Sequence, residues 1–386
     1  MSGERLRFPP VKLPLALFFA WTVLSLLVSG HPAEGLPQIR KFFVFGILLA
    51  ISSLFRNARE VRTLTVLWTV AALASATRGF LQFYHRYRDA VALHAQNYGF
   101  FLDDRMTGFT SLWMTFGGEE MIVVLMLLSL LMFSDVARIH RPQQSMGCAT
   151  WVGWIAAAVL LVSIVMGLTR SIFLLGLPAG MVYLLWNWKR WTIALLPAAA
   201  AMGLVIAPST VRERVVSVVR PHQGWDSNEH RYITRRVGWE MIRTHPLFGL
   251  GPEQVGRQFM SYVPPDVQKP LPRGWYGHLH NIYLQYAAER GIPATILLLW
   301  WMAVMIRDFR RALRDPAVTA DARAALNGAI AVIIAVLAEG LLEHNLGDSE
   351  VLTLFLSVAA AGYVARDDLE IAAGPAQQRD AEEQIV

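Results

Sequence analysis

A short histidine-rich segment, residues 277–281, holds the side chains best suited to acid–base chemistry. Histidine titrates near neutral pH, so a histidine at the mouth of a membrane cavity can accept a proton from a hydroxyl nucleophile. His278 and His280 are two residues apart on a predicted extended segment and could instead bind a metal ion, but other candidate ligands show no recognisable spacing. Asn281 also suits the N-cap of the next helix. The segment predicts a proton acceptor, with a metal pair as the alternative.

Four arginines, Arg105, Arg170, Arg231 and Arg235, are placed at or between the ends of predicted helices. A guanidinium group is a permanently charged, fork-shaped donor that suits phosphate oxygens. Arg170 has the alternative of anchoring a helix end at the membrane interface. Arg231 has the alternative of a surface ion pair with the neighbouring Glu229.

Acidic residues are predicted at the same side of the membrane as these arginines. Glu339 and Glu343 are one helical turn apart and are expected to share a face. Acidic groups near membrane depth are costly unless they are paired or line a wet cavity, so we expect them to pair with the arginines. Asp348 and Glu350 follow in the same region, whereas Glu119 and Glu120 fit this argument less well and have the alternative of lying at the membrane surface.

The composition indicates that lipid is the main solvent of this chain. Of its 386 residues, 54% are hydrophobic and 17% are charged, which lies outside the usual balance of a soluble domain. The net charge is +6, and the basic residues are spread over short connections between apolar runs. This pattern is typical of residues that set the membrane topology and not of a nucleic-acid-binding domain. The single cysteine, Cys148, excludes an intrachain disulfide framework.

We predict an all-α, polytopic membrane protein with about ten transmembrane helices, within a range of nine to twelve. The candidate spans are residues 13–29, 37–55, 62–83, 112–133, 151–168, 171–188, 191–207, 288–306, 325–343 and 350–365. The first span could be misread as a cleavable signal peptide, but the later spans need it to keep their orientation consistent.

Lysine and arginine counts in alternate short connections predict the orientation. The richer set comprises Arg5, Arg7, Lys12, Arg56, Arg59, Arg62, Arg138, Arg141, Lys189, Arg190, Arg307, Arg310, Arg311, Arg314, Arg323, Arg366 and Arg379. The poorer set comprises Arg40, Lys41, Arg78, Arg86, Arg88, Arg105 and Arg170. Both termini are therefore predicted to be cytoplasmic.

The predicted domains follow from these spans. Residues 1–207 contain the first seven transmembrane helices, 208–287 form an ordered outer loop, 288–365 contain the last three helices, and 366–386 form a polar cytoplasmic tail. Within the loop we expect a short amphipathic helix at 237–242, a turn at 249–252, an extended stretch at 263–274 and a helix from 282 to Gly291. An ordered loop of this length is usually functional.

Four segments resemble the O-antigen ligase and O-antigen polymerase superfamily of bacterial envelope glycosyltransferases. Residues 228–252 resemble its Arg-led helix and HPL-x-G-x-G turn, and residues 278–291 resemble its H-x-HN-x-x-LQ…AERG signature. Residues 105–116 look like R-x-TG-F…M-T-F, and residues 343–350 look like E-x-N-x-GDSE. The matches span residues 105–350, and the segment at 278–291 is the most specific.

The resemblance implies a GT-C-like fold and an undecaprenyl-diphosphate-linked glycan donor, with Arg105, Arg170 and Arg231 near the diphosphate. It implies that His280 is the base and that Arg231 also takes part in catalysis, without a metal or other cofactor and with inversion at the sugar. The expected supporting residues are His278, Asn281, Glu343, Asp348 and Glu350. The sequence departs from the family pattern at Arg235, where Trp is common, and at Thr169-Arg170-Ser171, where Ser more often precedes Arg.

The expected reaction takes place on the periplasmic face of the bacterial inner membrane. The leading acceptor is lipid A core, which would make the protein a ligase in lipopolysaccharide biosynthesis. Polymerase and protein O-oligosaccharyltransferase activities of the same superfamily are the alternatives. A transporter or flippase of lipid-linked sugars is an alternative of another class, but the predicted spans are apolar at their centres. The expected partners are the donor, the acceptor and membrane lipids, and not nucleic acid.

Overall fold

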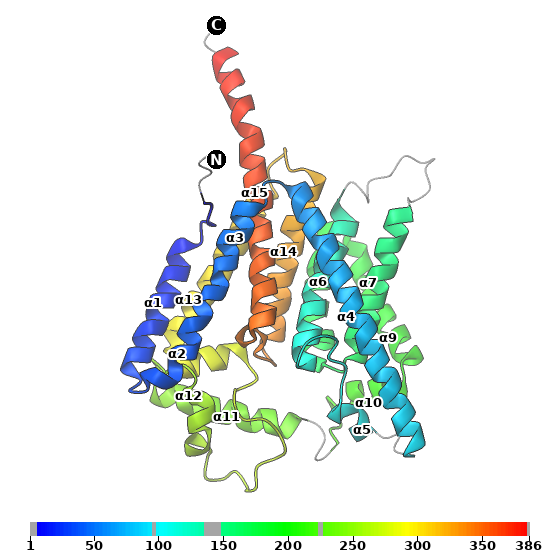
Figure 1. The fold of residues 1–386 in the computed structure, drawn as a ribbon, viewed down its shortest axis with the longest axis vertical. Coiled ribbons are helices and arrows are strands. Elements are labelled where there is room, and N and C mark those ends of the chain that lie inside the picture. The colour runs from blue at the N-terminus through cyan, green and yellow to red at the C-terminus, as the bar shows by residue number, and fades with distance from the viewer. Residues whose placement is uncertain (1–5, 95–97, 135–147, 223–226, 384–386) are drawn as a thin grey trace.

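The computed structural model describes residues 6–94, 98–134, 148–222 and 227–383, with side chains through Leu369. All regular elements within these ranges are helical (Figure 1). Arg5, Arg138 and Arg141 from the orientation count lie outside the described residues, as does the side chain of Arg379.

The apolar segments form one bundle of long helices. They are α1 (Lys12–Val28), α2 (Pro32–Arg40) with η1 (Lys41–Phe45) and α3 (Gly46–Leu54), α4 (Ala58–Ala92), α6 (Trp113–Phe133), α7 (Cys148–Met166), η3 (Ile172–Gly176) with α8 (Leu177–Trp188), η4 (Arg190–Ala194) with α9 (Leu195–Ile206), α13 (Ile282–Ala312), α14 (Ala320–Glu339) and α15 (Ser349–Glu383). Seven described segments are long and apolar enough to cross a membrane, and the shorter apolar helices α1, η3–α8 and η4–α9 correspond to the other predicted spans. The prediction of an all-α polytopic membrane protein is confirmed.

The centre of the bundle is α6, which is buried along most of its length and packs against α14. Small residues on its neighbours permit this close approach, as is typical of membrane helix packing. A Cβ on Gly328 of α14 would lie 2.7 Å from the sulfur of Met126, and a Cβ on Gly180 of α8 would lie 2.7 Å from Leu125. Larger side chains at these two glycines would push the helices apart.

The predicted outer loop contains four short helices and a small core of its own. They are α10 (Ser209–Val216), α11 (Asn228–Thr244), α12 (Gln254–Gln258) and η5 (Phe259–Tyr262). Helix α11 is amphipathic, because Ile233, Val237 and Met241 recur every four residues and face the buried side. It is longer than the predicted helix at 237–242, and the stretch predicted to be extended at 263–274 consists of turns and bends.

A kink at Gly291 joins this loop to the membrane bundle. The φ angle of Gly291 is 83°, a left-handed conformation that interrupts α13. The turn at residues 246–251 fits into the kink: Ile292 N donates to Pro246 O at 2.9 Å, and Leu250 N donates to Ala288 O at 2.8 Å. The HPL-x-G-x-G segment therefore packs directly against the AERG segment, and this contact is called the joint between the loop and α13.

The ninth span ends earlier than predicted. Helix α14 ends at Glu339, and Gly340 accepts a hydrogen bond from Ile282 N at 2.8 Å, which draws the chain toward α13. Glu343 therefore lies beyond the last residue of the helix, although Glu343 N still donates to Glu339 O at 3.1 Å, so that the two glutamates stay one turn apart as predicted.

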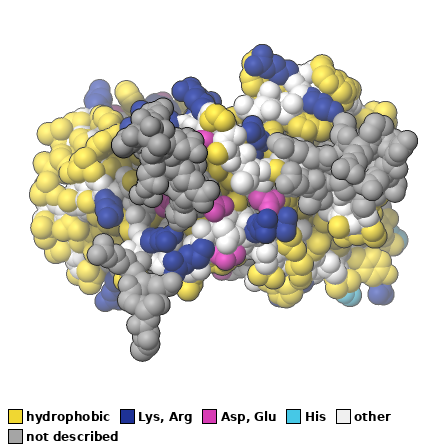
Figure 2. Space-filling model, turned by 90° about the horizontal axis from the view of Figure 1, so that it is seen from above, with side chains coloured by type: hydrophobic (Ala, Val, Ile, Leu, Met, Phe, Trp, Pro, Cys, Tyr) yellow, Lys and Arg dark blue, Asp and Glu magenta, His cyan; other side chains and the backbone are white. Residues whose placement is uncertain are grey.

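The two ends of the bundle differ. The first described residues and the C-terminal part of α15 lie at one end, whereas α5 (Tyr98–Asp103), α10, α11 and α12 lie at the other (Figure 1). Viewed from the end that holds the termini, lysine and arginine side chains are scattered over the face, at its edges and near its middle (Figure 2). This distribution agrees with the predicted orientation, which stays a prediction.

Candidate active site

His280 lies at the junction of the loop with α13 and is held in an uncommon backbone conformation. Its φ angle is 48°, which is left-handed, and such strain in a non-glycine residue is often found at functional sites. The next residue, Asn281, caps α13 by accepting from Leu284 N at 2.9 Å, as the sequence predicted. The Asn281 amide also donates to Leu341 O at 2.9 Å, which fixes His280 against the segment that carries Glu343.

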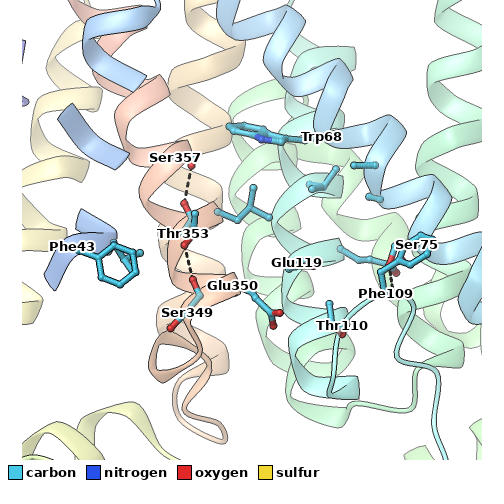
Figure 3. Close-up of a pocket in the computed structure, with 16 residues that line it drawn as sticks. Phe43, Trp68, Ser75, Phe109, Thr110, Glu119, Ser349, Glu350, Thr353 and Ser357 are labelled. Atoms are coloured by element: carbon cyan, nitrogen blue, oxygen red, sulfur yellow. Dashed lines mark hydrogen bonds between the residues drawn. The ribbon is translucent and has the colours of Figure 1, made fainter. Parts of the chain in front are cut away.

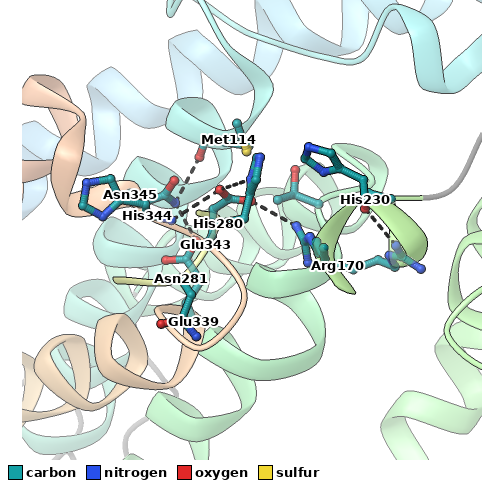
Figure 4. A network of polar contacts seen from close by, with 12 residues as sticks. Met114, Arg170, His230, His280, Asn281, Glu339, Glu343, His344 and Asn345 are labelled. Carbon is teal, nitrogen blue, oxygen red and sulfur yellow. Dashed lines mark hydrogen bonds and ion pairs between the residues drawn. The ribbon is translucent and has the colours of Figure 1, made fainter. Parts of the chain in front are cut away.

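Glu343 holds the imidazole ring of His280 (Figure 4). Its Oε1 lies 2.8 Å from His280 Nδ1, so the carboxylate accepts a hydrogen bond from that nitrogen. In a neutral His280 the proton is then on Nδ1, and Nε2 has a free lone pair. A carboxylate in this position fixes the tautomer of a base, as in the Ser-His-Asp arrangement of hydrolases.

The carbonyl oxygen of Trp275 is placed to accept a hydrogen bond from His280 Nε2 once that nitrogen carries a proton. It lies 3.0 Å from His230 Nε2 and 3.3 Å from His280 Nε2. Because a carbonyl has two lone pairs, it can accept from His230 at rest and from His280 as well once His280 is protonated. Burial, followed by the neighbouring His280, lowers the pKa of His230 to about 4, so His230 is neutral near pH 7.

Glu343 is buried and remains charged. Burial opposes its charge, but the hydrogen bond with His280 and the nearby charges outweigh burial and lower the pKa of Glu343 to about 2. Its Oε2 accepts from Arg231 at 3.0 Å. Glu343 therefore pairs with one of the arginines, as expected, and Arg231 uses this partner in place of Glu229. Glu339 instead accepts a hydrogen bond from the Asn345 amide.

A cavity of about 570 Å³ lies in front of His280, and arginines line much of it. Arg105, Arg170 and Arg231 all border it, as the sequence predicted that they would gather. Burial and the charge of Arg214 lower the pKa of Arg105 to about 9, which leaves its guanidinium charged at neutral pH. The accumulated positive charge suits a ligand with several negative charges.

The arginines differ in the contacts that their guanidinium groups already make within the protein. Arg170 is buried and donates to Ser217, Ser227 and Asn228, so it joins the start of η3 to the ends of α10 and α11. Arg105 stacks over Trp113 with 4.7 Å between the guanidinium carbon and the ring centre. Arg231 donates to Glu343, but its buried Nε has no hydrogen-bond partner among the residues that the structure describes. Arg231 is therefore held at the edge of the cavity by Glu343.

Sequence reasoning missed Arg214. It is buried on α10, donates to Leu168 O at 3.0 Å and to the Tyr98 hydroxyl at 3.0 Å, and lines the cavity. In the sequence it belongs to an ordinary-looking Arg-Glu-Arg run, Arg212–Arg214, and only an amphipathic reading of residues 209–216 could have singled it out.

Several predicted site residues lie elsewhere. Arg235 is exposed on α11 and does not line the cavity. Asp348 accepts hydrogen bonds from the Thr115 hydroxyl and from Glu350 N, which joins α6 to the start of α15. His278 does line the cavity, and burial lowers its pKa to about 3.

A second cavity, of about 650 Å³, lies between η1, α4, α6 and α15 (Figure 3). Glu119 and Glu350 are among its lining residues, together with apolar side chains such as Trp68 and Phe109. Glu120 also contributes to the lining, but it is buried and accepts a hydrogen bond from Ser163 on α7. Glu120 is therefore buried within the helix bundle.

One group in the described ranges could hold a metal ion, because the ligand atoms of His278, His280 and Glu343 lie within 4.8 Å of one another. Their existing contacts oppose this role. His280 N donates to His278 Nδ1 at 3.1 Å, so a neutral His278 carries its proton on Nε2 and offers no free lone pair. Glu343 is already shared by His280 and Arg231, and the surrounding arginines repel a cation. The cluster fits a hydrogen-bonded base better than a metal centre.

These features define a class: polytopic helical membrane proteins with an arginine-lined polar cavity at one end of the bundle. A family model described as O-antigen ligase matches residues 155–299, which confirms the resemblance seen in the motifs. The matched span includes Arg170, Arg231 and His280. Arg105 and Glu343 lie outside the matched span. No curated protein matches the chain.

Proposed function

We propose that this protein is an inverting glycosyltransferase that moves a glycan from a polyprenyl diphosphate to a hydroxyl acceptor at the outer face of the membrane. The observation that carries the proposal is the Glu343–His280 pair beside Arg231, which opens on the cavity lined by Arg105, Arg170 and Arg214. The O-antigen ligase family match supports it, since it points to a ligase- or polymerase-type membrane glycosyltransferase.

In the proposed step, His280 Nε2 takes the proton of the acceptor hydroxyl while that oxygen attacks the anomeric carbon. The bond between this carbon and the diphosphate oxygen breaks, and the electron pair leaves with the lipid diphosphate. Glu343 stabilises the imidazolium that forms. Arg231 and Arg105 balance the growing charge on the leaving group, which is the work that a divalent ion does in other transferases. Attack opposite to the leaving group inverts the anomeric centre.

The test uses purified protein with a polyprenyl-diphosphate-linked oligosaccharide and follows glycan transfer. His280→Gln removes the base and should lower kcat at least about 100-fold, within the range of general base catalysis. Arg231→Lys should also lose most activity, because lysine lacks the planar fork of the guanidinium group and cannot make its two-pronged contact. Arg235→Lys on the same helix is the matched control and should keep near-normal activity. Full turnover by His280→Gln would remove the proposed base, and translocation of donor without transfer would favour a flippase.

We propose lipid A core as the acceptor, so that the protein acts as a ligase in the inner membrane. The deciding observation is the envelope glycan of a strain that lacks the gene. Uncapped core with accumulated long polymer supports a ligase, whereas core that carries one repeat unit supports a polymerase. Normal lipopolysaccharide together with loss of glycoproteins would instead support a protein O-oligosaccharyltransferase.

A further inference from the structure

A third cavity, of about 530 Å³, lies between α8, α13 and α14 and is not part of the proposed active site. Its lining is apolar in one part and positively charged in another. Ala179, Val182 and Ile334 are apolar, whereas Arg310 and Arg314 form a cationic rim next to Trp186. The cavity therefore joins an apolar part to a charged part within one space.

The apolar part lies deeper in the bundle than the rim. Helices α8 and α14 run in opposite directions, because Tyr183 donates to Asn327 at 3.1 Å whereas Gly180 faces the carbonyl of Ala331. From Ala179 to Asn187, α8 advances by roughly 12 Å along its axis. The arginines belong to the last turns of α13, whose first turn follows His280. The rim therefore lies at the end of the bundle opposite to the proposed active site.

The two rim arginines are exposed and have no acidic partner among the residues that the structure describes. They are one helical turn apart on α13, so their charges repel one another. Arg310 lies beside the Tyr183 hydroxyl, and Arg190 stacks over Trp186 at 5.0 Å and adds a third positive charge. By contrast, Arg307 on the same helix pairs with Asp308 at 2.9 Å. An anion at the rim would relieve this repulsion.

We propose that this cavity binds an anionic glycerophospholipid from the leaflet at that end of the bundle, with its phosphate between Arg310 and Arg314. Basic pockets between membrane helices at the positively charged side suit such head groups. The apolar part gives the acyl chains a place to lie against Val182 and Ile334, which free phosphate would not use. The glycan donor is not the occupant, because its proposed diphosphate site is at the other end of the molecule.

The experiment is native mass spectrometry of delipidated full-length protein in detergent, titrated with phosphatidylglycerol and with phosphatidylcholine. We expect clear preference for phosphatidylglycerol. Arg310→Gln combined with Arg314→Gln should weaken its binding about 30-fold, from roughly fivefold for each arginine near an anionic lipid. The matched control is Arg59→Gln combined with Arg311→Gln, which removes the same charge from two positions that do not line the cavity. It should change the binding of phosphatidylglycerol less than threefold.

A second variant keeps the proposal testable if loss of the arginines impairs folding. Ala179→Trp fills the apolar part and leaves both arginines in place, so it should weaken lipid binding while a thermal melt shows a folded protein. Equal binding of both lipids, or an equal loss in the control variant, would overturn the proposal. So would stabilisation by inorganic phosphate equal to that by phosphatidylglycerol, because the site would then recognise a free anion.

Discussion

His280 depends on Glu343 for its orientation, and this dependence can be measured. Glu343→Gln preserves the size of the side chain but removes the negative charge that pairs with Arg231 and stabilises a protonated His280. We expect kcat to fall about 100-fold or more, with a smaller change in KM, since the charge acts mainly when the proton moves. The measurement is steady-state glycan transfer by the purified variant.

Glu240→Gln is the matched control, because Glu240 lies on the exposed side of α11 and pairs only weakly with Arg243 at 3.4 Å. Its turnover should equal that of the unmodified protein. A Glu343→Gln variant with normal kcat and normal thermal stability would show that the carboxylate has no part in the reaction.

The chemistry of single residues was partly readable from the sequence. Residue type and position were enough to single out the segment 277–281, Arg170 and Arg231. The choice of His280 as the base came from the resemblance to the O-antigen ligase superfamily. Backbone partners were not readable, and so the carbonyl of Trp275 could not be foreseen. Arg235 shows the converse, since the right residue type lies on the exposed side of its helix.

At the level of elements, the joint between the turn at 246–251 and the kink in α13 positions His280. A Cβ on Gly291 would lie 1.7 Å from the carbonyl oxygen of Leu247, and its φ angle of 83° is itself costly for alanine. We therefore expect Gly291→Ala to lower the melting temperature in detergent by several degrees and to reduce transfer activity. Thermal unfolding and a transfer assay check both outcomes.

Gly46→Ala is the matched control, since a Cβ on Gly46 of α3 meets no atom within 4 Å. It should melt at or slightly above the temperature of the unmodified protein, because alanine favours the helix. If Gly291→Ala behaved like Gly46→Ala, the kink would not be needed to hold the loop.

The elements themselves were better predicted than their ends. Apolar length alone located the spans, because a membrane requires about 20 apolar residues of helix. Hydropathy gave no means to see that α4 continues to Ala92 or that α14 stops at Glu339. Those ends are set by contacts distant in sequence, such as the bond from Ile282 N to Gly340 O.

At the scale of the whole molecule, the arrangement separates two kinds of positive charge. Among the arginines that line the proposed active site, Arg170 and Arg214 are buried and Arg105 and Arg231 are half-buried, and Arg273 alone is exposed. At the opposite end, Arg310 and Arg314 are exposed. The first kind suits ligand binding, and the second kind suits retention of that end on the cytoplasmic side. The arginine content therefore supports two predictions, the orientation of the chain at one end and the proposed chemistry at the other.

The single cysteine gives a direct measurement of this topology. Cys148 is exposed at the start of α7, in a connection predicted to be cytoplasmic. A membrane-impermeant maleimide added to intact spheroplasts should not label Cys148 and should label it after permeabilisation. In a variant that combines Cys148→Ser with Gln268→Cys, the new cysteine lies in the exposed loop after η5, and it should react in intact spheroplasts. If the two proteins showed the reverse labelling, the orientation of the chain would be opposite to the predicted one. His280 would then lie on the cytoplasmic side, where the proposed transfer to an outer acceptor could not take place.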